Sequence, residues 1–321
     1  MKNKHEVLVT RKLPNAVEAR LKRDYQARFN ADDRLYDKSD ILSKCDGCDA
    51  ILASPTDKFD ADLLADLPSS VRIIATFSVG YEHVDLNTAR ERNIIVTNTP
   101  DVLTAATADV AMLLLLGAAR RAYEAEQILR SSQWRTWETV LMLGTQVTGK
   151  RLGILGMGRI GRSMAQRARG FEMEVHYHDN IRLTPDEEQG AIYHARGEDL
   201  LPHSDFLSIH CPATVETHHW LNRERIDQLP KGAIVINTAR GTIVDDEALI
   251  VALNSGRLAA AGLDVYEGEP NINEGYRSIK NAMLLPHIGS ATRETRDAMG
   301  FKCLENLDAY FSGQAPPNRV D

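Results

Sequence analysis

The first hundred residues alternate short apolar segments with longer amphipathic ones. Apolar or β-branched runs at 5–10, 50–53, 73–76 and 94–97 predict strands, and the last three each follow material with helical character. Apolar positions spread over 15–29 predict a helix there. Short apolar strands separated by helices are typical of a parallel sheet that is covered by helices on both faces.

A second alternating series begins at Lys150. The segment 151–155 predicts a strand, 160–169 a helix and 174–178 another strand. Further apolar runs predict strands at 206–210, 233–237, 259–263 and 283–285. The chain is therefore expected to be an α/β protein with two doubly wound parallel-sheet units.

Two long segments lie outside the strand series. Residues 104–130 predict one long helix or two that abut, and 293–311 predict a final helix. The final helix needs a sheet to pack against. The economical arrangement is a chain that leaves the N-terminal unit and returns to it at the end.

Composition narrows the functional classes. A length of 321 residues favours two domains, and the net charge of −7, without any long Lys/Arg block, argues against a general nucleic-acid-binding role. The longest apolar stretch, Val110 to Ala119, lies between Asp109 and Arg120 and is shorter than the roughly 20 residues of a membrane span. The apolar run Val7–Val9 is too short for a signal peptide, so no membrane partner is expected.

Four cysteines bear on location and on metal binding. Cys45 and Cys48 have C-x-x-C spacing, but no second pair completes a zinc site of that kind. Together with Cys211 and Cys303 they are interpreted as reduced thiols of a cytoplasmic protein, with a redox-active dithiol as the alternative. No metal ion is expected.

The glycine-rich segment GMGRIG, residues 156–161, carries the first chemical signal. It follows a predicted strand and opens a predicted helix, which is the setting of a dinucleotide-binding loop. Gly156 would permit the tight turn, Gly158 the approach of backbone to a pyrophosphate, and Gly161 the close packing of helix and strand. The helix N-terminus would add unpaired N–H groups for the phosphates.

The end of the next predicted strand bears on the choice of cofactor. Asp179, 18 residues beyond Gly161, could accept hydrogen bonds from the ribose hydroxyls of NAD and would repel the 2′-phosphate of NADP. Arg182 lies three residues further on and could reach such a phosphate. NAD(H) is therefore favoured, and NADP(H) remains an alternative.

Three side chains have the types that reduction of a 2-oxo acid requires. Arg240, Glu269 and His287 each follow a predicted parallel strand, where open α/β sheets place their ligands. An arginine can hold a carboxylate, a histidine can protonate a carbonyl oxygen, and a glutamate beside the histidine can keep it protonated. Taken singly, each is more often a solvated or structural residue.

At this point the sequence resembles the D-isomer-specific 2-hydroxyacid dehydrogenases, and within them the glyoxylate/hydroxypyruvate/2-ketogluconate reductases. The resemblance implies a Rossmann cofactor domain, 101–287, inserted in a flavodoxin-like substrate domain, 1–100 plus 288–321. It implies NAD(P)H-dependent reduction of a small 2-oxo acid to the D-2-hydroxy acid. The matching segments are FSVGYEHVD (77–85), NTPDVLTAATADVAMLLLLGAAR (98–120), GKRLGILGMGRIG (149–161), HCPAT (210–214), INTARGTIVDDEAL (236–249), GLDVYEGEP (262–270) and PHIGSAT (286–292).

The resemblance also assigns roles to individual residues. It implies that Arg240, Glu269 and His287 are catalytic, and that Val79 and Gly80 present backbone N–H groups to the substrate carboxylate alongside Arg240 and His287. The implied cofactor contacts are Thr107, Gly156, Gly158, Arg159, Ile160, Gly161, Asp179, Cys211, Pro212, Thr217, Thr238, Ala239, Asp264 and Gly289.

The family comparison also implies a homodimer, formed through the helix and arm at 101–145. Trp134 and Trp137 lie in that arm, and the resemblance suggests that such a tryptophan reaches the partner's active site; ordinary core or interface aromatics are the alternative. NADP-preferring relatives commonly carry Asn-Arg or Ser-Arg at the end of the second cofactor strand. Here Asp179 and Asn180 occupy that place, which supports NAD.

Rival functions stay open at this stage. Phosphoglycerate, formate or phosphite dehydrogenases are related enzymes, but formate enzymes generally replace the glutamate with glutamine, and position 269 is Glu. Phosphoglycerate enzymes often carry an additional C-terminal domain, whereas this sequence ends at position 321. A non-catalytic protein that senses NAD on the same fold is the alternative from another class.

Overall fold

The computed structural model describes residues 4–320 and divides into two compact units. Unit 1 contains the residues up to Leu103 together with those from Ala291 on, and unit 2 is the single stretch Thr104–Ser290. Both crossing points lie three residues further along the chain than the predicted limits of 100 and 287. Unit 2 is thus inserted between the two segments of the chain that form unit 1.

Unit 1 is built on a five-stranded parallel sheet with the order β2-β1-β3-β4-β5. This order is that of flavodoxin-like folds, and it reverses direction between β1 and β3. Residues of β3 and β4 are buried throughout, as expected for strands covered on both faces. The strands are β1 (Glu6–Val9), β2 (Gln26–Phe29), β3 (Ala50–Ala53), β4 (Ile73–Thr76) and β5 (Ile95–Thr97).

Two groups of helices cover the two faces of this sheet. Alternate strand residues point to opposite faces, so Leu8 packs in one apolar cluster and Val7 and Val9 in the other. The first cluster is completed by α2 (Lys38–Lys44), α3 (Ala61–Asp66) and α4 (Leu86–Glu91). The second is completed by α1 (Asn15–Asp24) and by α12 (Arg293–Phe311), the helix formed after the chain returns from unit 2.

One prediction in unit 1 was wrong. The segment 15–29 is not one helix: α1 ends at Asp24, Tyr25 is extended, and Gln26–Phe29 form the edge strand β2. The strand exists because its backbone pairs with β1, with Val7 opposite Ala27. That pairing is a tertiary contact. The residues of 26–29 do alternate polar and apolar positions, but a run of four is too short to distinguish a strand from the end of a helix.

Unit 2 contains a seven-stranded parallel sheet with the order β12-β11-β10-β9-β6-β7-β8. Counted from β6, its first six strands follow the 3-2-1-4-5-6 order of the dinucleotide-binding fold, and the order reverses between β6 and β9. The strands are β6 (Arg151–Leu155), β7 (Glu174–His178), β8 (Ile192–Tyr193), β9 (Phe206–Ile209), β10 (Ala233–Asn237), β11 (Leu258–Leu263) and β12 (Ala282–Leu284).

Helices also cover both faces of the sheet of unit 2. On one face, α5 (Thr104–Ala119) and α7 (Arg159–Arg169) pack against alternate residues of β6, β7, β9, β10 and β11. The other face is covered by α9 (Gly197–Leu200), the short 3-10 helix η1 (Leu201–His203), α10 (Arg223–Ile226) and α11 (Asp246–Asn254). The short helix α8 (Pro185–Glu188) precedes β8, and the 3-10 helices η2 (Gly241–Ile243) and η3 (Glu274–Ser278) lie in connections.

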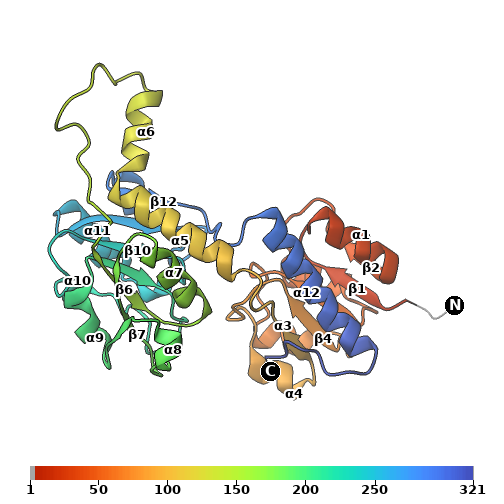
Figure 1. The fold of residues 1–321 in the computed structure, drawn as a ribbon. Coiled ribbons are helices and arrows are strands. Elements are labelled where there is room, and N and C mark those ends of the chain that lie inside the picture. Colours follow the sequence, from red (N-terminus) through yellow and green to blue (C-terminus); the bar gives the residue numbers. More distant parts are fainter. Residues whose placement is uncertain (1–3, 321) are drawn as a thin grey trace. The chain divides into compact units, whose positions relative to one another are not determined.

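The segment 104–130 forms two helices. Arg121 adopts a left-handed conformation with φ of 54°, which ends α5 at Ala119 and starts α6 (Ala122–Arg130) in a new direction. In Figure 1, α6 and the chain that follows it extend away from the sheet of unit 2. Within residues 4–320 no helix is long and apolar enough to cross a membrane.

The C-x-x-C pair is part of the core of unit 1. Cys45 and Cys48 are both free thiols and both fully buried, in the cluster that α2 and α3 form against the sheet. Burial raises the pKa of Cys45 to about 11, so its thiolate is scarce at neutral pH. The structure supports the interpretation as inert thiols over that of a redox-active dithiol.

The strands of unit 2 pair in one register at their carboxyl ends. Leu155 of β6 lies opposite His178 of β7 and Ile209 of β9, and Ile209 lies opposite Asn237 of β10. Asn237 in turn lies opposite Leu263 of β11. The residues immediately beyond this row therefore emerge side by side along one edge of the sheet.

An ion pair fixes the central strands at their opposite ends. The carboxylate of Asp205, just before β9, accepts hydrogen bonds from the guanidinium of Arg151 at 2.7 and 3.1 Å and from the Arg151 backbone N–H at 3.1 Å. The hydrogen bond from the Arg151 side chain lowers the pKa of Asp205 and outweighs the opposing effect of burial. The native state therefore favours the ionised carboxylate.

We predict that Asp205→Asn lowers the free energy of unfolding by about 1–2 kcal/mol at neutral pH, because charge-assisted hydrogen bonds are lost. The pKa of Asp205 is lower in the folded chain than the roughly 3.9 of an unfolded aspartate. Its contribution is thus present above that pH and lost as the pH falls through the native pKa. Denaturant unfolding at a series of pH values should show the wild type and variant converging in acid. A pH-independent difference would contradict this prediction.

Candidate active site

The glycine-rich loop lies at the point where the strand order of unit 2 reverses. Residues 156–161 connect β6 to α7, beside the chain that leaves β9 at Cys211. Gly156 has φ of +94°, and a Cβ atom there would lie 2.5 Å from the Cys211 backbone nitrogen. Both the backbone conformation and the close approach to Cys211 therefore require glycine at position 156.

The other two glycines of the loop differ in what surrounds them. A Cβ atom on Gly161 would lie 2.2 Å from the Gly156 carbonyl oxygen, so this residue allows the loop to close against α7. Gly158 is the N-cap residue of α7, and a Cβ atom there would point into open space. Exposed backbone at the start of a helix is suited to a pyrophosphate, so the loop fits the predicted cofactor.

Asp179 lies against this loop. It is the first residue after β7, and its carboxylate accepts a hydrogen bond of 2.7 Å from the backbone N–H of Met157. The side chain is thus held above the turn, half-exposed, at the place predicted for a ribose partner. Its remaining acceptor capacity can serve a ribose hydroxyl.

Arg182 is engaged elsewhere. Its guanidinium forms an ion pair with Glu188 at 2.8 Å, and the hydroxyl of buried Tyr177 donates to the same carboxylate at 2.7 Å. The hydrogen bond from Arg182, followed by that from Tyr177, lowers the pKa of Glu188. Binding a 2′-phosphate with Arg182 would break this ion pair and leave a buried carboxylate poorly compensated.

Arg240 occupies the connection after β10. The side chain of Asn237, the last residue of β10, donates to the Arg240 carbonyl and accepts from the Ala239 backbone N–H, both at 2.9 Å. This small ring of hydrogen bonds fixes the turn from which the guanidinium projects. This role of Asn237 is not evident from the sequence, although the residue lies in the INTARG segment on which the family resemblance rests.

Glu269 and His287 are in direct contact. Nδ1 of His287 lies 2.7 Å from Oε2 of Glu269, and the other carboxylate oxygen accepts the Tyr266 backbone N–H at 2.7 Å. The imidazole is half-exposed and adopts a backbone φ of 54°. With Nδ1 paired to the carboxylate, Nε2 is the ring nitrogen that can exchange a proton with a substrate.

The electrostatics of this pair favour an ionised glutamate. Burial opposes ionisation of Glu269, but the hydrogen bond and charge of His287, the Tyr266 N–H and the charge of Arg240 together hold its pKa below the usual value. The ionised carboxylate is a strong hydrogen-bond acceptor for Nδ1 of His287, 2.7 Å away. The structure thus brings Glu269 and His287 into direct contact within unit 2, and the charge of Arg240 adds to the lowering of the Glu269 pKa.

Asp264 fixes the backbone that leads to and follows His287. Its carbonyl accepts the His287 N–H at 2.9 Å, and its two carboxylate oxygens accept the N–H groups of Ile288 and Gly289, each at 2.7 Å. Burial raises the pKa of Asp264, and these two amide donors oppose that effect. Both carboxylate oxygens of this predicted cofactor contact therefore already accept hydrogen bonds from the backbone.

The remaining predicted cofactor residues differ in burial and in their hydrogen-bond partners. A Cβ atom on buried Gly289 would contact Thr107 at 3.4 Å, so these two residues are neighbours, as are Gly156 and Cys211. The buried hydroxyl of Thr238 has no hydrogen-bond partner within residues 4–320, a polar atom that a bound cofactor could satisfy. Thr217 instead uses its hydroxyl inside its own loop, donating to the Pro212 carbonyl at 2.8 Å. Further along the same edge, Arg159 is exposed, and Ile160 and Ala239 are partly buried.

Val79 and Gly80 lie in unit 1, after β4. Their carbonyl oxygens accept hydrogen bonds from the Asn98 side-chain amide at 2.8 Å and from the Ser78 hydroxyl at 2.5 Å, respectively. These bonds orient a short, half-buried stretch of backbone. Its own role as an anion-binding site remains a prediction.

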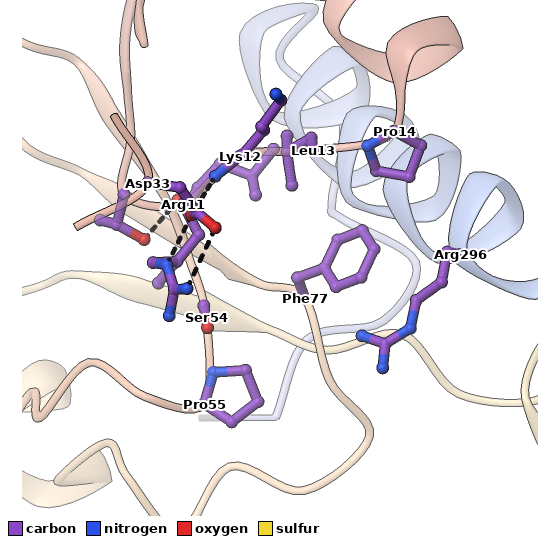
Figure 2. Close-up of a pocket in the computed structure, with 12 residues that line it drawn as sticks. Arg11, Lys12, Leu13, Pro14, Asp33, Ser54, Pro55, Phe77 and Arg296 are labelled. Atoms are coloured by element: carbon purple, nitrogen blue, oxygen red, sulfur yellow. Dashed lines mark hydrogen bonds and ion pairs between the residues drawn. The ribbon is translucent and has the colours of Figure 1, made fainter. Parts of the chain in front are cut away.

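Unit 1 also contains a pocket at its reversal point, between the ends of β1 and β3. The cavity has a volume of about 360 Å³ and was not predicted from the sequence. In Figure 2, Arg296 of α12 lies across the pocket from the ion pair of Arg11 and Asp33, with the Phe77 ring between them. Two arginines and an aromatic ring give unit 1 a ligand-sized, cationic hollow where open α/β sheets bind ligands.

Comparison with known proteins identifies the family. A model described as "D-isomer specific 2-hydroxyacid dehydrogenase, NAD binding domain" matches residues 112–289. The chain belongs to this family. It is therefore an oxidoreductase with a nicotinamide cofactor, and the predicted fold of two parallel-sheet domains is confirmed.

Individual relatives cover almost the whole chain. A glycerate dehydrogenase from Hyphomicrobium methylovorum is 41% identical over 313 residues, 97% of both chains. A glyoxylate reductase from Thermococcus litoralis is 42% identical over 322 residues, 99% of this chain and 97% of that one. The structure of an NADPH-dependent glyoxylate/hydroxypyruvate reductase from Sinorhizobium meliloti, in complex with NADP and malonate, matches with a TM-score of 0.89, at 34% identity over 99% of this chain and 97% of that chain.

The contrast between Gly158 and Gly161 yields a matched test of the loop. Gly158→Ala adds a methyl group that points into open space, so we predict a free energy of unfolding within about 0.5 kcal/mol of wild type but weaker binding of nicotinamide dinucleotide. Gly161→Ala overpacks the loop and should destabilise the chain by about 1–3 kcal/mol. Denaturant unfolding and calorimetric titration with NADH measure the two effects. Undiminished binding by Gly158→Ala would show that the backbone at 158 does not approach the cofactor.

Proposed function

We propose that this dehydrogenase reduces a small 2-oxo acid of the glyoxylate or hydroxypyruvate type to the D-2-hydroxy acid. The observation that carries the proposal is the contact of 2.7 Å between His287 and Glu269 beside Arg240. A histidine held by a carboxylate can act as the general acid and an arginine as the cation, the two groups that a 2-oxo acid needs besides a hydride donor. Relatives named glyoxylate reductase and glycerate dehydrogenase support the same substrate class.

The substrate carboxylate would be held by Arg240. A guanidinium forms two parallel hydrogen bonds with a carboxylate, which fixes the orientation of the acid as well as its position. The hydrogen bonds of Asn237 around the Arg240 turn support this role, because they restrict where the guanidinium can reach.

Proton transfer would occur at Nε2 of His287. Glu269 holds Nδ1 by a hydrogen bond, which would leave Nε2 as the ring nitrogen that donates a proton to the carbonyl oxygen. A reduced nicotinamide, when bound over the glycine-rich loop, supplies the hydride to C2. As charge develops on the substrate oxygen, His287 donates its proton and Glu269 then faces a neutral imidazole. In the reverse direction the same histidine accepts the proton of the hydroxyl group.

The assignment of His287 is tested by its removal. We predict that His287→Ala lowers kcat by about 10²–10⁴-fold, the usual contribution of a general acid. The readout is oxidation of NADH, followed by its ultraviolet absorbance, with glyoxylate, hydroxypyruvate, pyruvate and 2-ketogluconate. His203→Ala, at an exposed residue of the 3-10 helix η1, is the control and should retain wild-type turnover. Near-full activity of His287→Ala would overturn the role, and a wild type inactive with every 2-oxo acid would favour the NAD-sensing alternative.

We propose that the enzyme prefers NADH to NADPH. The support is the position of Asp179 above the glycine-rich loop and the engagement of Arg182 with Glu188. A 2′-phosphate beside the Asp179 carboxylate would be repelled by its negative charge. Arg182, the cation that could neutralise the phosphate, is already paired with Glu188. The related structure from Sinorhizobium meliloti contains NADP, so cofactor choice varies among similar proteins.

Replacement of Asp179 tests this preference. We predict that Asp179→Ser raises the ratio of kcat/KM for NADPH to that for NADH by at least about tenfold, because a like-charge contact of more than a kcal/mol disappears. Asp186→Ser removes the same charge from α8 and serves as the control, with the ratio unchanged. A wild type that already favours NADPH would contradict the preference.

We further propose a cytoplasmic homodimer assembled through α6 and the arm at 131–145. Residues 131–141 are all exposed in the single chain, although they include several large apolar side chains. A continuous group of this kind marks an interface. The large apolar side chains that are exposed between positions 113 and 143 are Leu113, Tyr123, Leu129, Trp134, Trp137, Val140, Leu141 and Leu143. The four free thiols fit a reducing compartment.

A charge placed in this group should separate the subunits. We predict that Leu129→Arg weakens dimer formation at least about tenfold, since a charge without a partner would be buried in the interface. Analytical ultracentrifugation over a range of concentrations measures the effect. Val251→Arg, at an exposed apolar residue of α11, is the matched control and should sediment as the wild type does. A wild type that is monomeric throughout would contradict the proposal.

A further inference from the structure

Two histidines and a glutamate form a cluster on the surface of unit 2 that the proposed reaction does not use. His218 and His219 belong to the connection between β9 and α10, and Glu267 belongs to the connection after β11. Nε2 of His219 lies 2.8 Å from one carboxylate oxygen of Glu267, and Nε2 of His218 lies 3.9 Å from the other. One ligand atom from each of the three residues falls within 4.8 Å of the other two.

These separations match the coordination of a small divalent ion. Zn²⁺ binds imidazole nitrogen and carboxylate oxygen at about 2.0–2.2 Å, and a tetrahedral arrangement then separates neighbouring ligand atoms by about 3.3 Å. The present distances of 2.8 and 3.9 Å bracket that value. Three protein ligands leave a fourth position for water, and the nitrogen-rich set favours zinc, cobalt or nickel over magnesium or calcium.

The backbones that carry the cluster are held in place. The His219 N–H donates to the Thr242 carbonyl at 2.8 Å. A Cβ atom on Gly241 would lie 2.1 Å from the Glu267 nitrogen. The connection after β10, which contains Gly241 and Thr242, therefore packs against both connections that carry the cluster. The two imidazole rings are stacked, with their centroids 4.1 Å apart. Only side-chain rotations are needed for the three atoms to converge, and all three side chains are partly exposed to solvent.

A second histidine cluster in the same unit shows what such a site requires. The rings of His176, His194 and His203 stack at 5.0–5.2 Å. However, the two ring nitrogens of His176 face different partners, Glu174 at 2.6 Å and His194 at 2.9 Å. Its nitrogens therefore diverge, and the cluster does not present three ligand atoms to one point.

We propose that His218, His219 and Glu267 form a binding site for a divalent transition-metal ion of the zinc class. The ion replaces the hydrogen bond between His219 and Glu267 and joins the connection after β9 to the connection after β11. Glu267 is two residues before Glu269, so the site lies on the same segment as the partner of His287. The buried Asp246 carboxyl, which accepts the Tyr276 hydroxyl at 2.6 Å, also senses the charges of Glu267 and His219 and would feel the added positive charge.

Titration of the full chain with metal ions tests the proposal without any assay of activity. The protein is treated with EDTA, freed of chelator and titrated with Zn²⁺ by calorimetry, and with Co²⁺ by visible absorption. We expect one ion per chain, with Co²⁺ bands typical of tetrahedral nitrogen and oxygen ligands. His219→Ala and His218→Ala should each weaken Zn²⁺ binding at least about tenfold and remove the Co²⁺ bands, since a lost first ligand costs at least as much as a lost supporting hydrogen bond.

Two further variants separate this site from other positions on the surface. Glu267→Gln keeps the shape of the side chain and its ability to accept a hydrogen bond but removes the charge, and it should weaken binding as the histidine variants do. His203→Ala removes an imidazole from the second cluster and should bind Zn²⁺ as the wild type does. The proposal is overturned if the wild type binds no ion saturably, or if His218→Ala, His219→Ala and Glu267→Gln all bind as the wild type does.

Discussion

The common register of the parallel strands in unit 2 is the constraint on which the site depends. Because Leu155, His178, Ile209, Asn237 and Leu263 lie in one hydrogen-bonded row, the chain leaves every strand at the same edge. The glycine-rich loop, the acidic residue after β7, the arginine turn and the segment leading to the glutamate all follow within a few residues of that row. Parallel pairing thus converts separate motifs of the sequence into neighbours.

Within that edge, the carboxylates have different tasks that follow from their surroundings. Asp264 is buried and gives both oxygens to backbone amides, so it fixes the path of the chain around His287. Glu269 gives one oxygen to a backbone amide and the other to the imidazole, and the positive groups around it keep it ionised. Asp264 thus supports the backbone around His287, which has an unusual positive φ. Glu269 supports the imidazole side chain of the same residue.

Unit 1 follows the same constraint with a different outcome. Its sheet reverses order between β1 and β3, and at that point the chain forms a cationic pocket rather than a glycine-rich turn. Val79 and Gly80 emerge from the same sheet edge after β4. The arrangement of strands therefore determines where a ligand can be received in each unit, and the residues after each strand determine which ligand it is.

The sequence by itself determined the fold class and nearly all strands, and it predicted which side chains are candidates for the reaction. Glycine spacing, apolar runs and the order of motifs are properties of the sequence itself, so they can be recognised without knowing which residues are in contact. Tertiary structure alone decided the edge strand β2, which is made by pairing with β1, and the role of Asn237, which depends on the turn it closes. It also decided the engagement of Arg182 with Glu188 and the meeting of His219 with Glu267 across 48 positions of sequence. Such contacts form when segments that are distant in the sequence pack against each other. The local pattern of apolar and polar residues does not specify which distant segments will meet.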